Sequence, residues 1–106
     1  MKAEEISKLA MDALDELKGV NIVEIDVRGR SSVTDFMVIA SGTSDRHLRS
    51  LGERVVERAK QAGIQPLGIE GGRDNGWVLV DLFDVVIHIM RPDVREFYSL
   101  EKLWAV

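Results

Sequence analysis

The sequence predicts an α/β fold: a single-domain mixed β-sheet of about five strands with flanking helices, in the order αββαβββα. Three observations predict it. Apolar residues recur at helical spacing near the N-terminus and again in the middle of the chain. The unbroken apolar run FMVIA, at residues 36–40, is typical of a strand buried on both faces. Two β-rich runs, at 77–82 and 85–90, have almost nothing between them and indicate an antiparallel hairpin.

The first half of the chain begins with a helix, predicted over residues 2–18, which Gly19 is suited to end. The segment IVEIDV, at 22–27, alternates as a half-buried strand does. After a loop and the buried strand, a second helix is expected over 44–62. The apolar stripes of the two helices comprise Ile6, Leu9, Ala10, Ala13, Leu14 and Leu17, and Leu48, Leu51, Val55, Ala59 and Ala62.

The second half begins with QPLGIE, at 65–70, which is expected to form a short strand. GGRDNG, at 71–76, is a turn before the hairpin. Pro92 is suited to the first turn of a last helix, which the tail SLEKLWAV continues or breaks. Residues 1–106 are therefore expected to form one domain.

Composition and charge narrow the classes of function. With 14 Lys and Arg against 18 Asp and Glu, the chain is acidic, a poor candidate for nucleic acid and a better one for a basic protein partner. The absence of cysteine excludes disulfides and thiolate catalysis. No apolar run is long enough to span a membrane, and the acidic, amphipathic N-terminus is unlike a signal peptide. A cytoplasmic protein with no membrane association is expected.

The segment SGTSDRHLRS, at 41–50, carries several residues that resemble catalytic groups. A strand, a glycine and a helix N-terminus present free N–H groups that suit an anion, so a nucleotide-binding or nucleotidyltransferase-like enzyme using the corner from Gly42 to Asp45 is the alternative function. Phosphate-binding fingerprints need more glycines or a Gly-Lys-Ser/Thr ending, which are missing. Capping by Ser44 or Asp45 accounts for the same residues without a ligand. Ser44, Asp45 and His47 are too close in sequence to form a triad alone, so no catalytic residue and no cofactor are predicted.

The hairpin sequence WVLVDLFDVVIHIM predicts two different faces. If Leu82 and Phe83 are the loop residues, Trp77 lies opposite His88. Alternation then gives one aliphatic face and one mixed face, the latter made of Trp77, Leu79, Asp81, Val86 and His88. The mixed face either binds a protein or is covered by a helix, which would make Trp77 a core residue. Leu-Phe suits a two-residue turn poorly, because such turns need positive φ, so a longer loop and a shifted register stay open.

A metal site at the hairpin is conceivable but not predicted. Asp81 and Asp84 could hold Mg²⁺ across the turn, yet no third acidic residue lies nearby in the sequence. Aspartates beside turns commonly make local hydrogen bonds instead. The tail at 97–104 is aromatic, and is expected either to dock on the domain or to form a contact patch.

Taken together, four blocks of sequence, at 31–51, 68–72, 77–90 and 97–104, resemble the ribosomal silencing factor family RsfS, also called the Iojap family. The resemblance implies a nucleotidyltransferase-like fold without that activity, since an Asp-x-Asp metal pair is missing. It also implies binding to the large ribosomal subunit through ribosomal protein uL14. Such binding would block joining of the small subunit and repress translation, especially when nutrients are short. Homodimers are implied as well.

The same resemblance assigns partner-binding residues to the hairpin, the preceding turn and the tail. They are Glu70, Trp77, Asp81, His88, Tyr98, Leu100, Glu101, Lys102, Leu103 and Trp104. One departure from the family pattern is Phe83, where many members carry a small residue, usually glycine. The conformation of the hairpin tip is therefore an open question for the structure.

Overall fold

A computed structural model describes residues 1–72 and 75–104 of the chain. In this part the elements follow the predicted order, except that the last helix is divided in two. Their bounds are α1 (Ala3–Glu16), β1 (Val20–Asp26), β2 (Phe36–Ser41), α2 (Asp45–Gln61), β3 (Gly68–Gly71), β4 (Trp77–Asp81), β5 (Val85–Met90), α3 (Pro92–Tyr98) and α4 (Leu100–Trp104).

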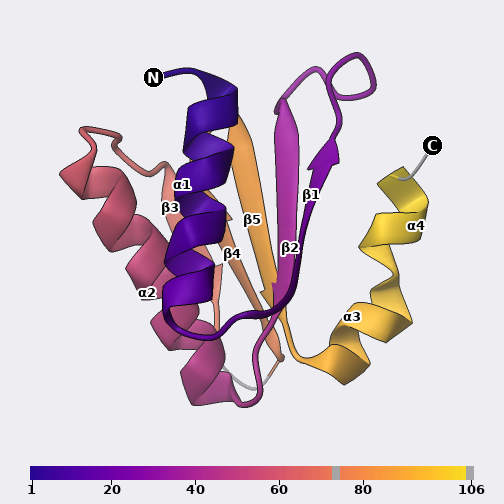
Figure 1. Ribbon diagram of the computed structural model, residues 1–106. Helices are drawn as coiled ribbons and strands as arrows, with labels where there is room; N and C mark the ends of the chain where they lie inside the picture. Colours follow the sequence, from indigo (N-terminus) through magenta and orange to yellow (C-terminus); the bar gives the residue numbers. More distant parts are fainter. Residues whose placement is uncertain (73–74, 105–106) are drawn as a thin grey trace.

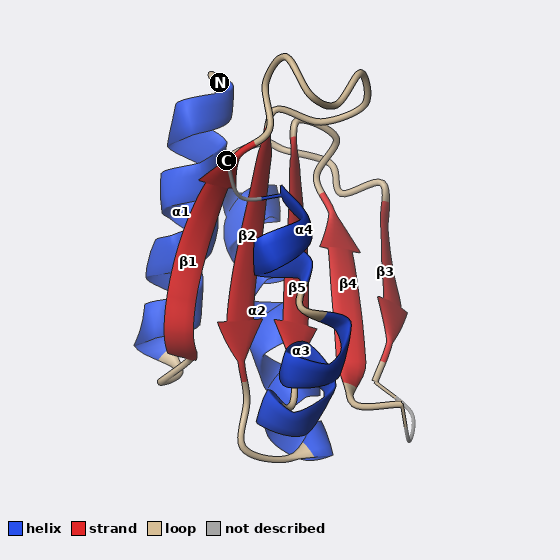
Figure 2. Cartoon of the chain, turned by 90° about the vertical axis from the view of Figure 1, so that its right-hand side faces the viewer, coloured by secondary structure: helices blue, strands red, loops and turns tan. Residues whose placement is uncertain are grey.

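The strands form one mixed sheet in the order β1-β2-β5-β4-β3. Strands β2 and β5 run parallel, and the other neighbours are antiparallel. Helices α1 and α2 cover one face of this sheet, and α3 and α4 lie against the other (Figure 1). Figure 2 shows that α3 and α4 lie over β2 and β5 and leave β3 and β4 uncovered on that side. The predicted α/β fold with a mixed, five-stranded sheet is confirmed.

Two apolar clusters lie on the two faces of the sheet. The larger joins the apolar stripes of α1 and α2 to alternate residues of β2, β4 and β5. The smaller, beneath α3 and α4, consists of Val27, Met37, Ile39 and Met90. Every residue of β2 is buried, as the run at 36–40 predicted, because clusters cover both of its faces.

The C-terminal helix breaks at Ser99, which adopts a left-handed conformation with φ of 49°. The N–H of Ser99 donates to the carbonyl oxygen of Arg95 at 2.9 Å and ends α3. The chain then turns back into α4, which places Glu101 beside Arg95.

The predicted hairpin register was wrong by two residues. Trp77 pairs with Met90, Leu79 with His88, and Asp81 with Val86. Because a strand repeats every two residues, a shift of two leaves each side chain on its predicted face. The mixed face therefore stands as predicted, with Met90 added to it.

The register follows from the conformation of the tip, which comprises Leu82, Phe83 and Asp84. The N–H of Asp84 donates to the carbonyl oxygen of Leu82 at 3.0 Å, and Phe83 between them has a φ of 74°. This is a γ-turn of the rarer kind, in which the central residue is strained. The carboxylate of Asp81 accepts a hydrogen bond from the N–H of Phe83 at 2.9 Å and stabilises the turn.

Replacing Phe83 tests this strain. A side chain at positive φ costs about 1–2 kcal/mol, whereas glycine loses about 0.5–1 kcal/mol of backbone entropy on folding. We expect Phe83→Gly to leave the free energy of unfolding unchanged or to raise it by up to about 1 kcal/mol, measured by urea denaturation. Phe83→Ala, which keeps a Cβ at the strained φ, is the control. A glycine variant clearly less stable than the alanine variant would contradict the assignment.

Candidate functional site

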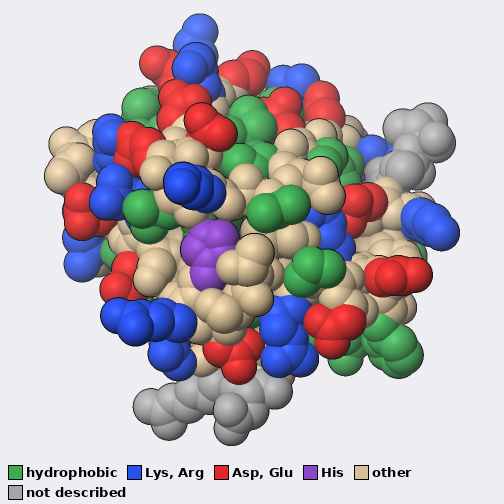
Figure 3. All heavy atoms as spheres, turned by 60° about the horizontal axis from the view of Figure 1, so that its bottom comes forward, with side chains coloured by type: hydrophobic (Ala, Val, Ile, Leu, Met, Phe, Trp, Pro, Cys, Tyr) green, Lys and Arg blue, Asp and Glu red, His purple; other side chains and the backbone are tan. Residues whose placement is uncertain are grey.

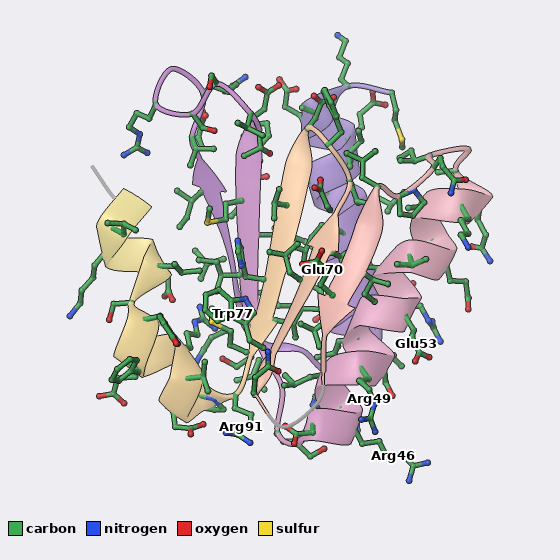
Figure 4. The ribbon with its side chains drawn as sticks, turned by 180° about the vertical axis from the view of Figure 1, so that it is seen from behind. Arg46, Arg49, Glu53, Glu70, Trp77 and Arg91 are labelled. Atoms are coloured by element: carbon green, nitrogen blue, oxygen red, sulfur yellow. The ribbon has the colours of Figure 1, made fainter. Side chains whose placement is uncertain are left out.

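The most distinctive exposed surface lies on the open side of β3 and β4. We call it the Trp77 face and define it as Glu70, Trp77, Leu79, Asp81 and Tyr98. Trp77 begins β4 on the side of the sheet that carries α3, and Glu70 lies on the edge strand β3 (Figure 4). Its strand residues share one side of the sheet because Glu70 pairs with Leu79, and Trp77, Leu79 and Asp81 alternate along β4.

Two shallow hollows run along this face. One, of about 220 Å³, is lined by Glu70, Gly71, Asn75, Trp77 and Leu79. The other, of about 160 Å³, is lined by Leu67, Gly68, Glu70, Leu79 and Asp81. Because Glu70 and Leu79 line both, the hollows form one trough with an indole at one end and a carboxylate at the other. An aromatic and apolar floor with carboxylates beside it suits a basic protein surface better than a nucleic acid.

The indole of Trp77 is held on two sides. Its Nε1–H donates to Nδ1 of His88 at 3.0 Å, and its ring lies against Tyr98 with centroids 4.9 Å apart. Tilted aromatic pairs at this separation are favourable beyond the area that they bury. Trp77 is therefore half-buried and fixed before any partner arrives, a position between the two that the sequence left open.

His88 supports Trp77 from within the sheet. Only 8% of its surface is exposed, and burial lowers the pKa of its imidazole from 6.5 to about 4. A neutral ring with its proton on Nε2 leaves Nδ1 free to accept from the indole. His88 therefore supports Trp77 and does not face solvent, and its predicted role in partner binding stays a prediction.

Arg95 anchors the C-terminal helices and was not identified from the sequence. Its Nε and Nη2 donate to the two carboxylate oxygens of Glu101 at 2.8 and 3.2 Å, and its Nη1 donates to Oγ of Ser41 at 3.0 Å. Only 8% of Arg95 is exposed. An arginine in a short helix is typical of a surface residue, and Ser41 is 54 positions away, so no local pattern points to this site.

The predicted residues of the tail divide into two groups. Tyr98 joins Trp77, while Leu100 packs against the smaller apolar cluster and Glu101 pairs with Arg95. Lys102 and Leu103 are exposed on α4, which ends at Trp104. The structure thus brings Tyr98 to the Trp77 face and gives Leu100 and Glu101 a supporting role.

The corner after β2 is a helix cap, as predicted. Oγ of Ser44 accepts from the N–H of His47 at 3.0 Å. Nδ1 of His47 accepts from the N–H of Thr43 at 2.9 Å, so its Nε2 donates to the carbonyl oxygen of Leu17 at 2.7 Å. Asp45 pairs with Arg91 at 3.4 Å. Figure 3 shows basic and acidic side chains interspersed at this end of the molecule, without the single-sign field that would concentrate an anion.

The carboxylate of Asp81 at the hairpin has a local role. Asp81 accepts from the tip, as described above, and residues 1–72 and 75–104 contain no group of three or more His, Asp or Glu side chains placed to hold a metal ion. Within the same residues, every helix is too short or too polar to cross a membrane.

The fold and this face define a small α/β domain with an exposed surface of mixed aromatic, aliphatic and acidic composition, a composition common in protein-binding surfaces. The model of one family, described as "Ribosomal silencing factor during starvation" (RsfS), matches residues 1–106. The chain belongs to the RsfS family.

Individual relatives agree with this membership. A ribosomal silencing factor RsfS of Haemophilus influenzae is 47% identical over 95 residues, covering 90% of this chain and 93% of its own length. A crystal structure of a Chromobacterium violaceum protein matches with a TM-score of 0.95 at 43% identity, covering 98% of this chain and 87% of that one. A mouse protein named "Mitochondrial assembly of ribosomal large subunit protein 1" is 39% identical over 89 residues, covering 81% of this chain and 39% of its own. The likeness to nucleotidyltransferases stays a prediction.

The depressed pKa of His88 predicts acid sensitivity. Its pKa of about 4 lies below the ordinary 6.5, so between these two values the imidazole is protonated in the unfolded chain and neutral in the folded chain. Stability is therefore fully present above pH 6.5 and falls as the pH drops towards 4, by about 3 kcal/mol in total. The free energy of unfolding, measured from pH 7.5 to 4.5, should fall less steeply in His88→Gln. His47→Gln, which leaves the Trp77–His88 pair in place, should keep the full slope; equal slopes in all three proteins would refute the assignment.

Removing the Arg95 anchor should loosen α3 and α4. Arg95→Ala leaves the carboxylate of Glu101 and the hydroxyl of Ser41 without their hydrogen-bond donor. We expect the free energy of unfolding to fall by about 2–4 kcal/mol, less than for a fully buried pair because Glu101 is partly exposed. Hydrogen exchange should accelerate first in α3 and α4. Arg91→Ala, which removes the more exposed pairs with Asp45 and Asp93, is the control and should cost less than about 1 kcal/mol. Equal losses in the two variants would contradict the anchoring role.

Proposed function

We propose that the protein is a silencing factor of the cytoplasm that binds the large ribosomal subunit through ribosomal protein uL14. In the bound state it would cover the surface on which the small subunit docks and so repress translation, especially when nutrients are limiting. The observation that carries the proposal is the Trp77 face, an immobilised indole beside an acidic trough, on a chain of the RsfS family.

Charge supports a basic protein as the partner. Glu70 is exposed and Asp81 half-exposed along the trough, and the whole chain has a net charge of −4. Opposite potentials accelerate encounter and suppress wrong partners. The name of the mouse relative, which mentions the ribosomal large subunit, is consistent with a partner on that subunit.

Silencing of this kind needs no chemistry. A bound domain with principal extents of 33 × 32 × 20 Å would physically obstruct the joining of the two subunits wherever it covers their common surface. The fraction of large subunits blocked then equals the fraction occupied, which depends on the dissociation constant and on the concentration of the protein.

The alternative, an enzyme using the corner from Gly42 to Asp45, is not favoured. Two of the N–H groups at this corner, those of Thr43 and His47, already donate to the side chains of His47 and Ser44, and Asp45 places a carboxylate at the same helix end. The proposed homodimer is a separate prediction, to be tested by the molar mass in solution.

Co-sedimentation with isolated large subunits tests the proposal. We expect the wild-type protein to pellet with the subunits at near-physiological salt, and Trp77→Ala to bind at least about tenfold more weakly, because a central aromatic anchor carries much of the energy of an interface. A wild-type protein that stays at the top of the gradient would end the proposal.

A matched pair of charge reversals separates the face from the total charge. Glu70→Lys changes the trough, whereas Glu53→Lys makes the same change on α2, away from α3 and α4 (Figure 4). The first variant should weaken binding about tenfold and the second should leave it unchanged. Equal losses would mean that only net charge matters, and would remove the Trp77 face from the proposed interface.

A further inference from the structure

The hairpin tip combines a strained backbone with an exposed aromatic side chain. Phe83 is the central residue of the γ-turn, at a φ of 74°, yet 61% of its surface is exposed. The backbone of the turn is fixed by Asp84 and by the carboxylate of Asp81. A bulky residue in a strained, outward-facing position buries little of its apolar surface in the isolated fold, and such outliers concentrate at functional sites.

A second exposed apolar residue lies beside the base of the tip. Leu67 is 64% exposed, and its N–H donates to the carbonyl oxygen of Asp81 at 2.9 Å. Asp81 also accepts a hydrogen bond from the N–H of Phe83, so the backbones of Leu67 and Phe83 are both held by the same residue. We call Leu67 and Phe83 the tip pair.

Leu67 connects the tip pair to the Trp77 face. The hollow that Leu67 lines shares Glu70 and Leu79 with the hollow beside Trp77. One partner seated along the trough would therefore reach Trp77 at one end of β4 and the tip at the other.

We propose that the tip pair is a second anchor for the protein that occupies the Trp77 face. Phe83 would enter an apolar pocket of that partner, with basic side chains at its rim facing Asp81 and Asp84. This inference rests on the proposed function, and it adds a contact at the far end of the sheet.

The chemistry of the tip favours protein over RNA. Carboxylates lie on both sides of Phe83 and repel phosphates, and no lysine or arginine lies within four positions of it in the sequence. An apolar side chain between acidic groups instead complements an apolar pocket with a basic border.

The experiment compares dissociation constants for isolated large subunits. Phe83→Gly keeps or improves the turn, so any loss of binding reports the side chain and not the fold. We expect the dissociation constant to be at least about fivefold larger for Phe83→Gly and for Leu67→Ser than for the wild type. Val23→Thr, which reduces an exposed apolar side chain on β1, at the opposite edge of the sheet, is the control and should bind as the wild type does.

The outcomes separate this inference from the proposed function. If Trp77→Ala loses binding while Phe83→Gly and Leu67→Ser bind as tightly as the wild type, the second anchor is overturned and the proposed function stands. If the wild type does not bind, both fall. If Phe83→Gly keeps its affinity but converts a wild-type dimer into a monomer, the tip joins two copies of the chain and the inference is overturned. If Phe83→Gly and Leu67→Ser weaken binding to protein-free ribosomal RNA as much as they weaken binding to the large subunit, the tip pair contacts RNA and its assignment to a protein partner is overturned.

Discussion

The parallel pairing of β2 with β5 is the constraint on which the rest of the structure depends. It joins the two halves of the chain along the centre of the sheet, with Phe36 opposite Val85 and Ser41 opposite Met90. Every residue of β2 is buried as a result, and both apolar clusters form around this pair of strands. The same pairing places Ile39 beside His88, so the residue that holds Trp77 lies next to the fully buried strand β2.

Polar groups, in turn, attach the Trp77 face and the C-terminal helices to this core. His88 and Arg95 are both nearly buried, and each directs its nitrogens towards a defined partner: the indole of Trp77 in one case, Glu101 and Ser41 in the other. In the described part of the chain, no buried side-chain nitrogen or oxygen lacks a hydrogen bond. Since unpaired buried groups are costly, the contacts of Arg95 favour one arrangement of α3 and α4, and the Trp77–His88 bond favours one orientation of the indole.

Local patterns predicted the elements well and their tertiary contacts poorly. The apolar run of β2, the cap at Ser44 and the alternation that put Trp77 and His88 on one face are short-range properties, and the structure confirms them. The hairpin register depended on Phe83 adopting a conformation that non-glycine residues rarely take. The anchoring role of Arg95 depends on a contact with Ser41 of β2, which is 54 positions away in the sequence. Whether Glu70, Asp81 and the tail residues contact a partner is still a prediction, because an isolated chain shows exposure and not recognition.

The fixed indole has a consequence for the thermodynamics and rates of association. A free tryptophan loses rotamer freedom when it is captured, and immobilising a side chain at an interface costs about 0.5–1.5 kcal/mol. Trp77 incurs that cost during folding, through His88 and Tyr98. A partner that bound this face would therefore meet a rigid anchor and would need no rearrangement of Trp77. Substitutions of Trp77 itself, which leave the charges of the face unchanged, should accordingly alter the lifetime of a complex more than the rate of its formation.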